Sequence, residues 1–321
     1  ASSAKWIASG MGNALTSVDD TINIEDRILS YIPDSKDLVL RRDGGCMLAN
    51  GDIFCWGNNQ YKKAGIESYG QLDTSLKPDY VNTPVMLKVQ IDNIEVNNET
   101  LDLITKKWYN NPYRVKFEKM AMNNKFICGI SPIFDYYEAG IRYKLGGDLY
   151  CNGYIHSDYF QTDNTGQIET SILRKNKIVA TGKENRIYNS SAIYLKDIVM
   201  VDGTWILLSD TGTLYSVGSN EKGALGIGST DQTIYTYTPQ IINPSGVLFK
   251  KIYALRDIKG FGALDSQNYF WIWGERASGK IWTKPIVLSN SYKFNENAIF
   301  VNSQDFVLKR VDNKYLRTYS D

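Results

Sequence analysis

The sequence predicts an all-β protein, specifically a β-propeller of four-stranded antiparallel blades. Three observations support this. A hairpin pattern recurs along the chain, other short apolar runs flank each recurrence, and helical periodicity is almost absent. Repeats of roughly 45 to 50 residues, each forming a small antiparallel sheet, are typical of propellers. Since one blade cannot bury both of its faces, the units are expected to stack around an axis.

The repeat consists of a turn residue, an apolar strand, and a glycine six positions after the turn residue. Gly and Asn, which tolerate the positive φ of a tight hairpin, occupy the turn position in the clear copies. These copies are residues 51–57, 147–153, 212–218 and 268–274, and a worn fifth copy is 314–320.

A second apolar run precedes each hairpin, and proline-bearing extended segments follow some of them. The lead-in runs are 117–120, 195–198 and 249–252, and the proline-bearing segments are 83–87 and 284–288. Each unit therefore holds three or four short strands.

Residues 218–226, which follow the hairpin strand 212–215, resemble the repeat of the regulator of chromosome condensation family. The matching positions are Gly218, Asn220, Gly223 and Leu225-Gly226. Two further units match partly, through Gly57, Asn59, Ala64 and Gly65 and through Gly274 and Gly279. The resemblance implies a propeller, usually of seven blades.

We therefore expect one domain over 1–321 with six or seven blades, of which five are clear repeats. We expect pairing of the chain ends to close the ring, which would remove free sheet edges, and residues 6–10 are a possible leftover strand. Inserted loops are expected near 96–114 and 129–145.

Four cysteines fall on the predicted hairpins. If Asn50-Gly51 is a two-residue type I′ turn, Ala49 faces Asp52, and Cys46 faces Cys55 three pairs further out. That is a non-hydrogen-bonded pair, with Cα atoms about 4.5 Å apart, which suits a disulfide.

Cys151 precedes Gly153 as Cys55 precedes Gly57, and Cys128 lies on the preceding strand, so a second bridge is predicted. Free core thiols are the alternative, and zinc is disfavoured because no short C-x₂₋₄-C spacing occurs. Disulfides imply a periplasmic, cell-surface or secreted protein.

The insert before Cys151 is the main candidate binding site. Its residues Phe134, Asp135, Tyr136, Tyr137 and Glu138 offer three aromatic rings and two acids where other copies need only a short turn. Rigid aromatic side chains make effective contact surfaces. The alternative is that this loop folds over and caps a neighbouring blade.

The sequence offers three weaker candidates for functional residues. The insert 96–114, with Trp108 and Tyr113, is either a contact loop or a degenerate strand. His156, the one histidine, could serve as an acid or base near a carboxylate but is more often an ordinary loop residue. Packing between blades is the favoured role of four tryptophans, namely Trp56, Trp205, Trp271 and Trp273.

Composition narrows the class of function. A formal net charge of +1 gives no electrostatic reason to expect nucleic acid or direct membrane insertion, and no apolar run is long enough to span a bilayer. The chain shows no phosphate-binding loop, dinucleotide fingerprint, zinc-protease motif or nucleophile elbow. We therefore expect no enzyme activity, cofactor or metal.

The leading hypothesis is an exported, non-enzymatic propeller that binds a protein or host-surface ligand, as an adhesin, pilus-associated or secretion-linked component. Its first residues suggest a processed chain that lacks an upstream targeting or anchoring segment, and its Lys, Asn, Ile and Tyr usage suggests a bacterial source. One alternative, implied by the family resemblance, is a guanine-nucleotide exchange factor-like effector that acts on a small GTPase. A second is a carbohydrate-binding or carbohydrate-active propeller.

Overall fold

The computed structural model describes residues 35–41, 44–58, 80–86, 116–138, 141–147, 149–153, 174–175, 193–255 and 257–318. The chain divides into two compact units. Unit 1 comprises Ala1–Pro132 and Asp148–Asn176, and unit 2 comprises Ile133–Gly147 and Lys177–Asp321. Strands and short turns dominate the described part, whose one helical element is the 3₁₀ turn η7 (Glu221–Gly223). No helix there is long and apolar enough to cross a membrane.

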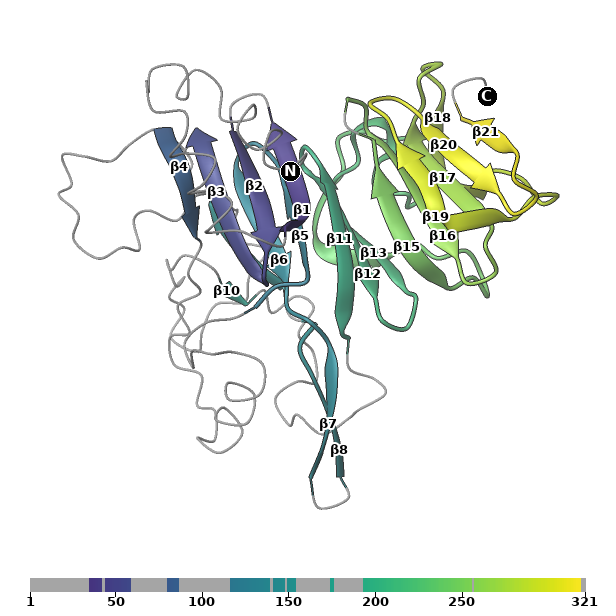
Figure 1. The fold of residues 1–321 in the computed structure, drawn as a ribbon. Coiled ribbons are helices and arrows are strands. Elements are labelled where there is room, and N and C mark those ends of the chain that lie inside the picture. Colours follow the sequence, from purple (N-terminus) through teal and green to yellow (C-terminus); the bar gives the residue numbers. More distant parts are fainter. Residues whose placement is uncertain are drawn as a thin grey trace. The chain divides into compact units, whose positions relative to one another are not determined.

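Unit 1 contains two four-stranded sheets in which all neighbouring strands are antiparallel (Figure 1). The first has the order β1 (Ser35–Arg41), β2 (Gly44–Ala49), β3 (Asp52–Asn58), β4 (Tyr80–Met86). The second has the order β10 (Arg174–Lys175), β9 (Leu149–Gly153), β6 (Phe126–Ile130), β5 (Lys119–Met122).

Unit 2 contains three further antiparallel sheets and a separate hairpin (Figure 1). The third sheet is β11 (Leu195–Val201), β12 (Thr204–Ser209), β13 (Leu214–Ser219), β14 (Tyr235–Ile241). The fourth is β15 (Phe249–Ala254), β16 (Gly260–Asp265), β17 (Phe270–Glu275), β18 (Ile281–Val287). The fifth is β19 (Phe294–Val301), β20 (Phe306–Arg310), β21 (Tyr315–Arg317), and the hairpin is β7 (Phe134–Glu138) with β8 (Ile141–Leu145).

The prediction of an all-β chain is confirmed for the described residues, and the five repeats each fall on one antiparallel sheet. Four of these sheets have the predicted four strands, and the fifth has three described strands. Blade number, ring closure and the single-domain interpretation stay predictions. The lead-in runs 195–198 and 249–252 lie on β11 and β15, the run 117–120 leads into β5, and the proline-bearing segments form most of β4 and β18. Residues 6–10 and 96–114 lie outside the described part.

The hairpin turns contain Gly or Asn at positive φ, as predicted. Asn50 and Gly51 have φ of 51° and 79°, as a type I′ turn requires, and Asn268 takes φ of 73° at the equivalent turn. In the fifth copy the prediction was wrong by one residue, because the turn residue is Asn313, at φ of 65°, and not Lys314. Asn tolerates this left-handed conformation better than Lys because its short side chain can hydrogen-bond locally.

In three repeats the terminal glycine lies where the pairing of the sheet is irregular. Pairing between the third and fourth strands shifts register beside Gly57, Gly218 and Gly274. At Gly218, with φ of 102°, an added Cβ would overlap the carbonyl oxygen of Gly203. Close backbone approach therefore explains why this position of the repeat is glycine.

A backbone hydrogen bond ties each of the first four hairpin turns to the start of the next sheet. The acceptor is the carbonyl of the turn residue, and the donor is the N–H of a buried apolar residue that begins or precedes the next sheet's first strand. The four bonds are Phe117 to Gly51 at 2.7 Å, Leu195 to Gly147 at 3.0 Å, Phe249 to Gly212 at 2.9 Å and Phe294 to Asn268 at 2.8 Å. We refer to this arrangement as the turn lock.

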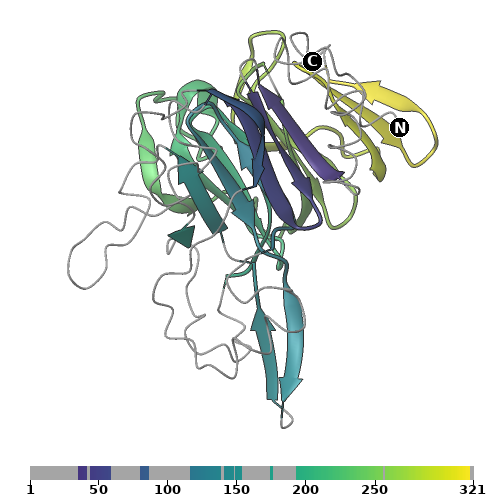
Figure 2. The ribbon, with the colours of Figure 1, turned by 60° about the vertical axis from the view of Figure 1, so that its left-hand side comes forward.

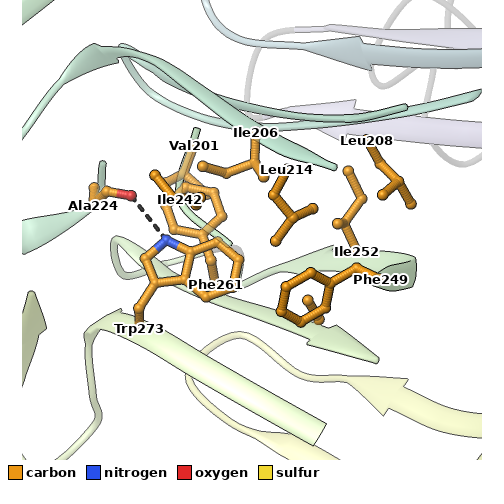
Figure 3. Packing of buried hydrophobic residues seen from close by; sticks show 11 residues of the cluster. Val201, Ile206, Leu208, Leu214, Ala224, Ile242, Phe249, Ile252, Phe261 and Trp273 are labelled. Atoms are coloured by element: carbon orange, nitrogen blue, oxygen red, sulfur yellow. Dashed lines mark hydrogen bonds between the residues drawn. The ribbon is translucent and has the colours of Figure 1, made fainter. Parts of the chain in front are cut away.

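Apolar side chains fill the spaces between successive sheets of unit 2. Figure 3 shows Ile206, Leu208 and Leu214 of the third sheet facing Phe249 and Phe261 of the fourth. A second cluster joins the fourth and fifth sheets through Leu264, Phe270, Phe294, Phe306 and Leu308. Burial of these faces is the main favourable free-energy term that stacks the sheets.

Candidate functional site

The insert between β6 and β9 forms a two-stranded ribbon rather than an irregular loop. Phe134, Asp135, Tyr136, Tyr137 and Glu138 make up β7, which pairs only with β8 among the described strands. Both ribbon views show β7 and β8 as a narrow extension beyond the sheets of unit 2 (Figures 1 and 2). The insert is 131–146, because residues 129 and 130 still pair with β9 as part of β6.

The register of the ribbon separates its residues into two unlike faces. Tyr136 pairs with Tyr143, and Phe134 pairs with Leu145. Since alternate residues of a strand share a face, one face carries five apolar or aromatic residues and one acid, namely Phe134, Tyr136, Ile141, Tyr143, Leu145 and Glu138. The opposite face carries Asp135, Tyr137, Arg142 and Lys144. The ribbon is therefore amphipathic by position.

The sequence interpretation expected an inserted loop near 129–145 but did not recognise its second half, residues 141–145, as a strand. The run Ile141-Arg142-Tyr143-Lys144-Leu145 alternates apolar and charged residues strictly. That alternation is the signal of a strand with one apolar face and could have revealed β8.

The base of the ribbon is anchored on β11. Gly147, at φ of 61°, accepts the turn-lock hydrogen bond from Leu195. A Cβ at Gly147 would come within 2.9 Å of the backbone N and O of Leu195, so only glycine fits. The end of the ribbon is therefore held at the hairpin-turn position of the repeat.

Both predicted disulfides are present. Cys46 bonds to Cys55 and Cys128 bonds to Cys151, with Cα separations of 4.1 and 4.0 Å. The predicted hairpin register, with Ala49 opposite Asp52 and Cys46 opposite Cys55, is confirmed as well. The second bridge lies two residue pairs before the ribbon insert, since Gly129 and Ile130 separate Cys128 from it.

The segment 218–226, which resembles the repeat of the regulator of chromosome condensation family, holds a loop in place in this chain. The buried amide of Asn220 donates to the carbonyls of Ser229 and Asp231, at 3.2 and 2.8 Å, and accepts from the N–H of Leu225 at 3.3 Å. The neighbouring Ala224 carbonyl accepts the indole N–H of Trp273 at 3.0 Å (Figure 3). These bonds hold the loop against the next sheet, so the motif serves packing.

The predicted packing between sheets is confirmed for Trp271 and Trp273, which belong to the cluster between the third and fourth sheets. Trp56, Trp205 and Trp273 are each at most 3 % exposed. Trp271 is half-buried, and its indole N–H donates to Asp265 at 2.9 Å. His156 lies outside the described residues.

One ion pair joins the first strands of the fourth and fifth sheets. Lys250 on β15 forms an ion pair with Glu296 on β19, and this hydrogen bond and charge lower the pKa of Glu296. Burial raises the pKa of Tyr253 well above its ordinary value, and the charges of Asp197 and Glu296 add to the shift. Across the described residues no group of three or more His, Cys, Asp or Glu could hold a metal ion.

No family model and no curated protein matches the sequence. Solved structures do match. Human WBSCR16 is 12 % identical over 88 % of this chain and 61 % of its own, with a TM-score of 0.55. Prp20p of Saccharomyces cerevisiae, the yeast RCC1, is 14 % identical over 88 % of this chain and 59 % of its own, with a TM-score of 0.51.

The chain therefore spans about three fifths of the length of both proteins. At such identities the likeness concerns the fold alone. Together with the repeated four-stranded antiparallel sheets, it shows that this chain has the fold of an RCC1-like β-propeller.

Proposed function

We propose that this chain is an exported, non-enzymatic propeller protein that binds a protein partner through the β7–β8 ribbon. The observation that carries the proposal is the amphipathic register of the ribbon. Isolated two-stranded hairpins are marginally stable in water, and an aromatic face at a protruding position gains free energy when a partner covers it. Aromatic side chains also dominate the energetics of protein interfaces.

Export is supported by the two disulfides, because such bonds form and persist in oxidising compartments. An adhesin, pilus-associated or secretion-linked role on a bacterial or host-facing surface fits that setting. A glycan ligand is the alternative for the same aromatic ribbon, and the test below separates the two.

A second candidate is a guanine-nucleotide exchange factor-like effector acting on a small GTPase. The similarity to Prp20p supports it, since that structure was reported with the binding of Prp20p to Gsp1p and histones. Release of a fluorescent guanine nucleotide from small GTPases, measured with and without this chain, tests this candidate.

The experiment for the leading proposal screens the full chain against extracellular proteins and a glycan array. The repeat itself supplies the control variant. Replacing 131–146 by Ala-Asn, ahead of the native Gly147-Asp148, copies the turn of residues 49–52 and keeps the turn lock on Leu195. We expect this variant to fold and to lose the partner.

Point variants test whether the apolar face of the ribbon binds the partner. Tyr136→Ser and Tyr143→Ser, on the apolar face, should each weaken binding about tenfold, the usual cost of removing an aromatic anchor. Tyr137→Ser, on the opposite face, is the matched control and should change affinity little. Equal losses for Tyr136→Ser and Tyr137→Ser, or binding that survives removal of the ribbon, would contradict the proposal.

A further inference from the structure

The hairpin turns of unit 2 lie on one side of its sheets. In each sheet the first residue of the first strand pairs with the residue just ahead of the hairpin turn. These pairs are Leu195 with Ser209, Phe249 with Asp265, and Phe294 with Arg310. The same first residues donate their N–H groups to the preceding turns through the turn lock. Each turn is therefore held beside the next one, and we call this side of unit 2 the turn side.

The ribbon starts from the turn side as well. Its second strand ends two residues ahead of Gly147, whose carbonyl accepts the N–H of Leu195 at 3.0 Å. The ribbon therefore occupies the position of a hairpin turn at one end of the row of turns. A protein that binds the ribbon would approach unit 2 from the turn side.

Aromatic and basic residues gather on the turn side between the fourth and fifth sheets. The ammonium of Lys293 lies 5.4 Å from the ring centroid of Tyr269, and the guanidinium carbon of Arg310 lies 3.5 Å from that of Tyr292. The N–H of Val311, next to Arg310, donates to the carbonyl of Lys293 at 3.1 Å, so the two basic residues are neighbours. We call Tyr269, Tyr292, Lys293 and Arg310 the turn-side cluster.

The exposure of the turn side does not depend on a neighbouring sheet. Leu248 is 51 % exposed and Tyr292 is 38 % exposed, although both lie in connections flanked by described sheets. Leu248 accepts the N–H of Ser266 at 2.8 Å and so lies against the turn of the fourth sheet. Ser266 and Gln267 in that turn stay exposed even though the fifth sheet follows. Stacking of sheets therefore leaves this side open.

The cluster has a positive charge that is available for a ligand. Arg310 forms an ion pair with Asp312, but the ion pairs among the described residues do not include Lys293. At the opposite ends of the sheets Lys259 is paired with two acids. An unpaired cation beside exposed aromatic and aliphatic side chains favours an acidic ligand, because the opposite charge adds attraction and suppresses basic competitors.

We propose that the turn-side cluster docks an acidic surface of the protein partner that the ribbon binds. A carboxylate of the partner pairs with Lys293, and apolar groups beside it contact Leu248 and Tyr292. Aromatic and aliphatic contacts of this kind exclude water around the charge. This inference rests on the proposed function of the ribbon and adds the chemistry of its partner.

The probes are a fluorescent oligoglutamate peptide and an oligogalacturonate that carries the same dye and the same number of carboxylates. Fluorescence anisotropy with the full chain should show binding of the peptide, and this binding should weaken as salt screens the charges. Tighter binding of the oligogalacturonate than of the peptide would overturn the assignment to a protein partner in favour of an anionic glycan.

A charge reversal assigns the binding to the cluster. Lys293→Glu should weaken the peptide about fivefold, the effect expected for the loss of an exposed ion pair of about 1 kcal/mol. Lys280→Glu is the matched control, because Lys280 is also exposed and lies 4.3 Å from the ring centroid of Trp282, at the opposite ends of the sheets. Both variants change the net charge equally, so equal losses would overturn the inference.

A second variant should strengthen binding, which damage to the fold would not do. Asp312→Asn removes the acid that pairs with Arg310 and keeps an oxygen to accept the N–H of Lys314, so the peptide should bind more tightly. Weaker binding by this variant would contradict the role of Arg310.

The chain with 131–146 replaced by Ala-Asn separates this inference from the proposal for the ribbon. This variant should bind the peptide as the native chain does, since it keeps the turn-side cluster. If the ribbon has no partner, peptide binding persists while the screen fails. No binding by the native chain, or loss of binding with the ribbon, would overturn the inference.

Discussion

Single residues of the repeat have specific structural roles. Asn220 is fully buried and uses both ends of its amide to hold the loop 218–234. Gly218 permits a close backbone approach that any side chain would block. A motif that resembles a family signature therefore encodes the packing of one sheet on the next, which is why it says little about a partner.

We predict that Gly218→Ala destabilises the protein by more than about 3 kcal/mol, because the added Cβ overlaps a carbonyl in a strained backbone conformation. Gly246→Ala is the control, since Gly246 also has positive φ, at 73°, but a Cβ added there would meet no atom within 4 Å. Its cost should be about 1 to 2 kcal/mol, that of the conformation alone. Urea unfolding measures both, and equal losses would refute the role of the close approach.

A second prediction concerns the amide. Asn220→Ala removes three side-chain hydrogen bonds and leaves the N–H of the buried Leu225 without its acceptor, so we expect a loss of about 2 to 4 kcal/mol in the free energy of unfolding. Gln232→Ala, on the exposed side of the same loop, should stay within about 0.5 kcal/mol. A small effect at Asn220 would show that water replaces the lost bonds.

At the scale of elements, three edge strands carry a proline at the same position. The outermost strands β4, β14 and β18 carry Pro84, Pro239 and Pro285, each one residue before the pair adjoining the bulge. Proline lacks an N–H, so it weakens an edge as a template for pairing with other chains. The equivalence of these positions emerged only with the strand register.

At the level of elements, the ion pair between β15 and β19 predicts a pH dependence. The pKa of Glu296 is lowered from its ordinary 4.5, so its contribution to stability is present above that value and is lost as pH falls through the lower folded-state pKa. The difference in unfolding free energy between the native chain and Glu296→Gln should be under about 1 kcal/mol near neutral pH, as for other exposed pairs. Chemical denaturation at pH 7 and pH 3 measures it, and a difference unchanged at pH 3 would refute the pairing.

For the whole molecule, the disulfides predict a redox state. Intact mass should fall by four hydrogens relative to the reduced chain, with peptides mapping to Cys46–Cys55 and Cys128–Cys151. Because each of these cysteines is at most 4 % exposed, a phosphine reductant should act slowly until denaturant is added. Four thiols that react rapidly in the native protein would remove the argument for export.

Local chemistry made much of the fold predictable. A turn such as Asn50-Gly51 fixes its own register, and that register places Cys46 opposite Cys55. The repeated lead-in and hairpin runs identified the strands because period-2 patterns and turn residues depend on near neighbours. In the candidate site, residues 134–138 were identified by composition, but their pairing with 141–145 was not.

The sequence by itself determined the all-β class, the repeats, the hairpin register and both disulfides, since each depends on residues close together along the chain. The tertiary structure alone decided how one sheet meets the next. The turn lock and the covered pairs such as Leu264 with Phe270 became visible only when distant segments were compared by position. Burial is a property of the assembled sheets, so it depends on residues far apart along the chain and does not follow from one repeat alone.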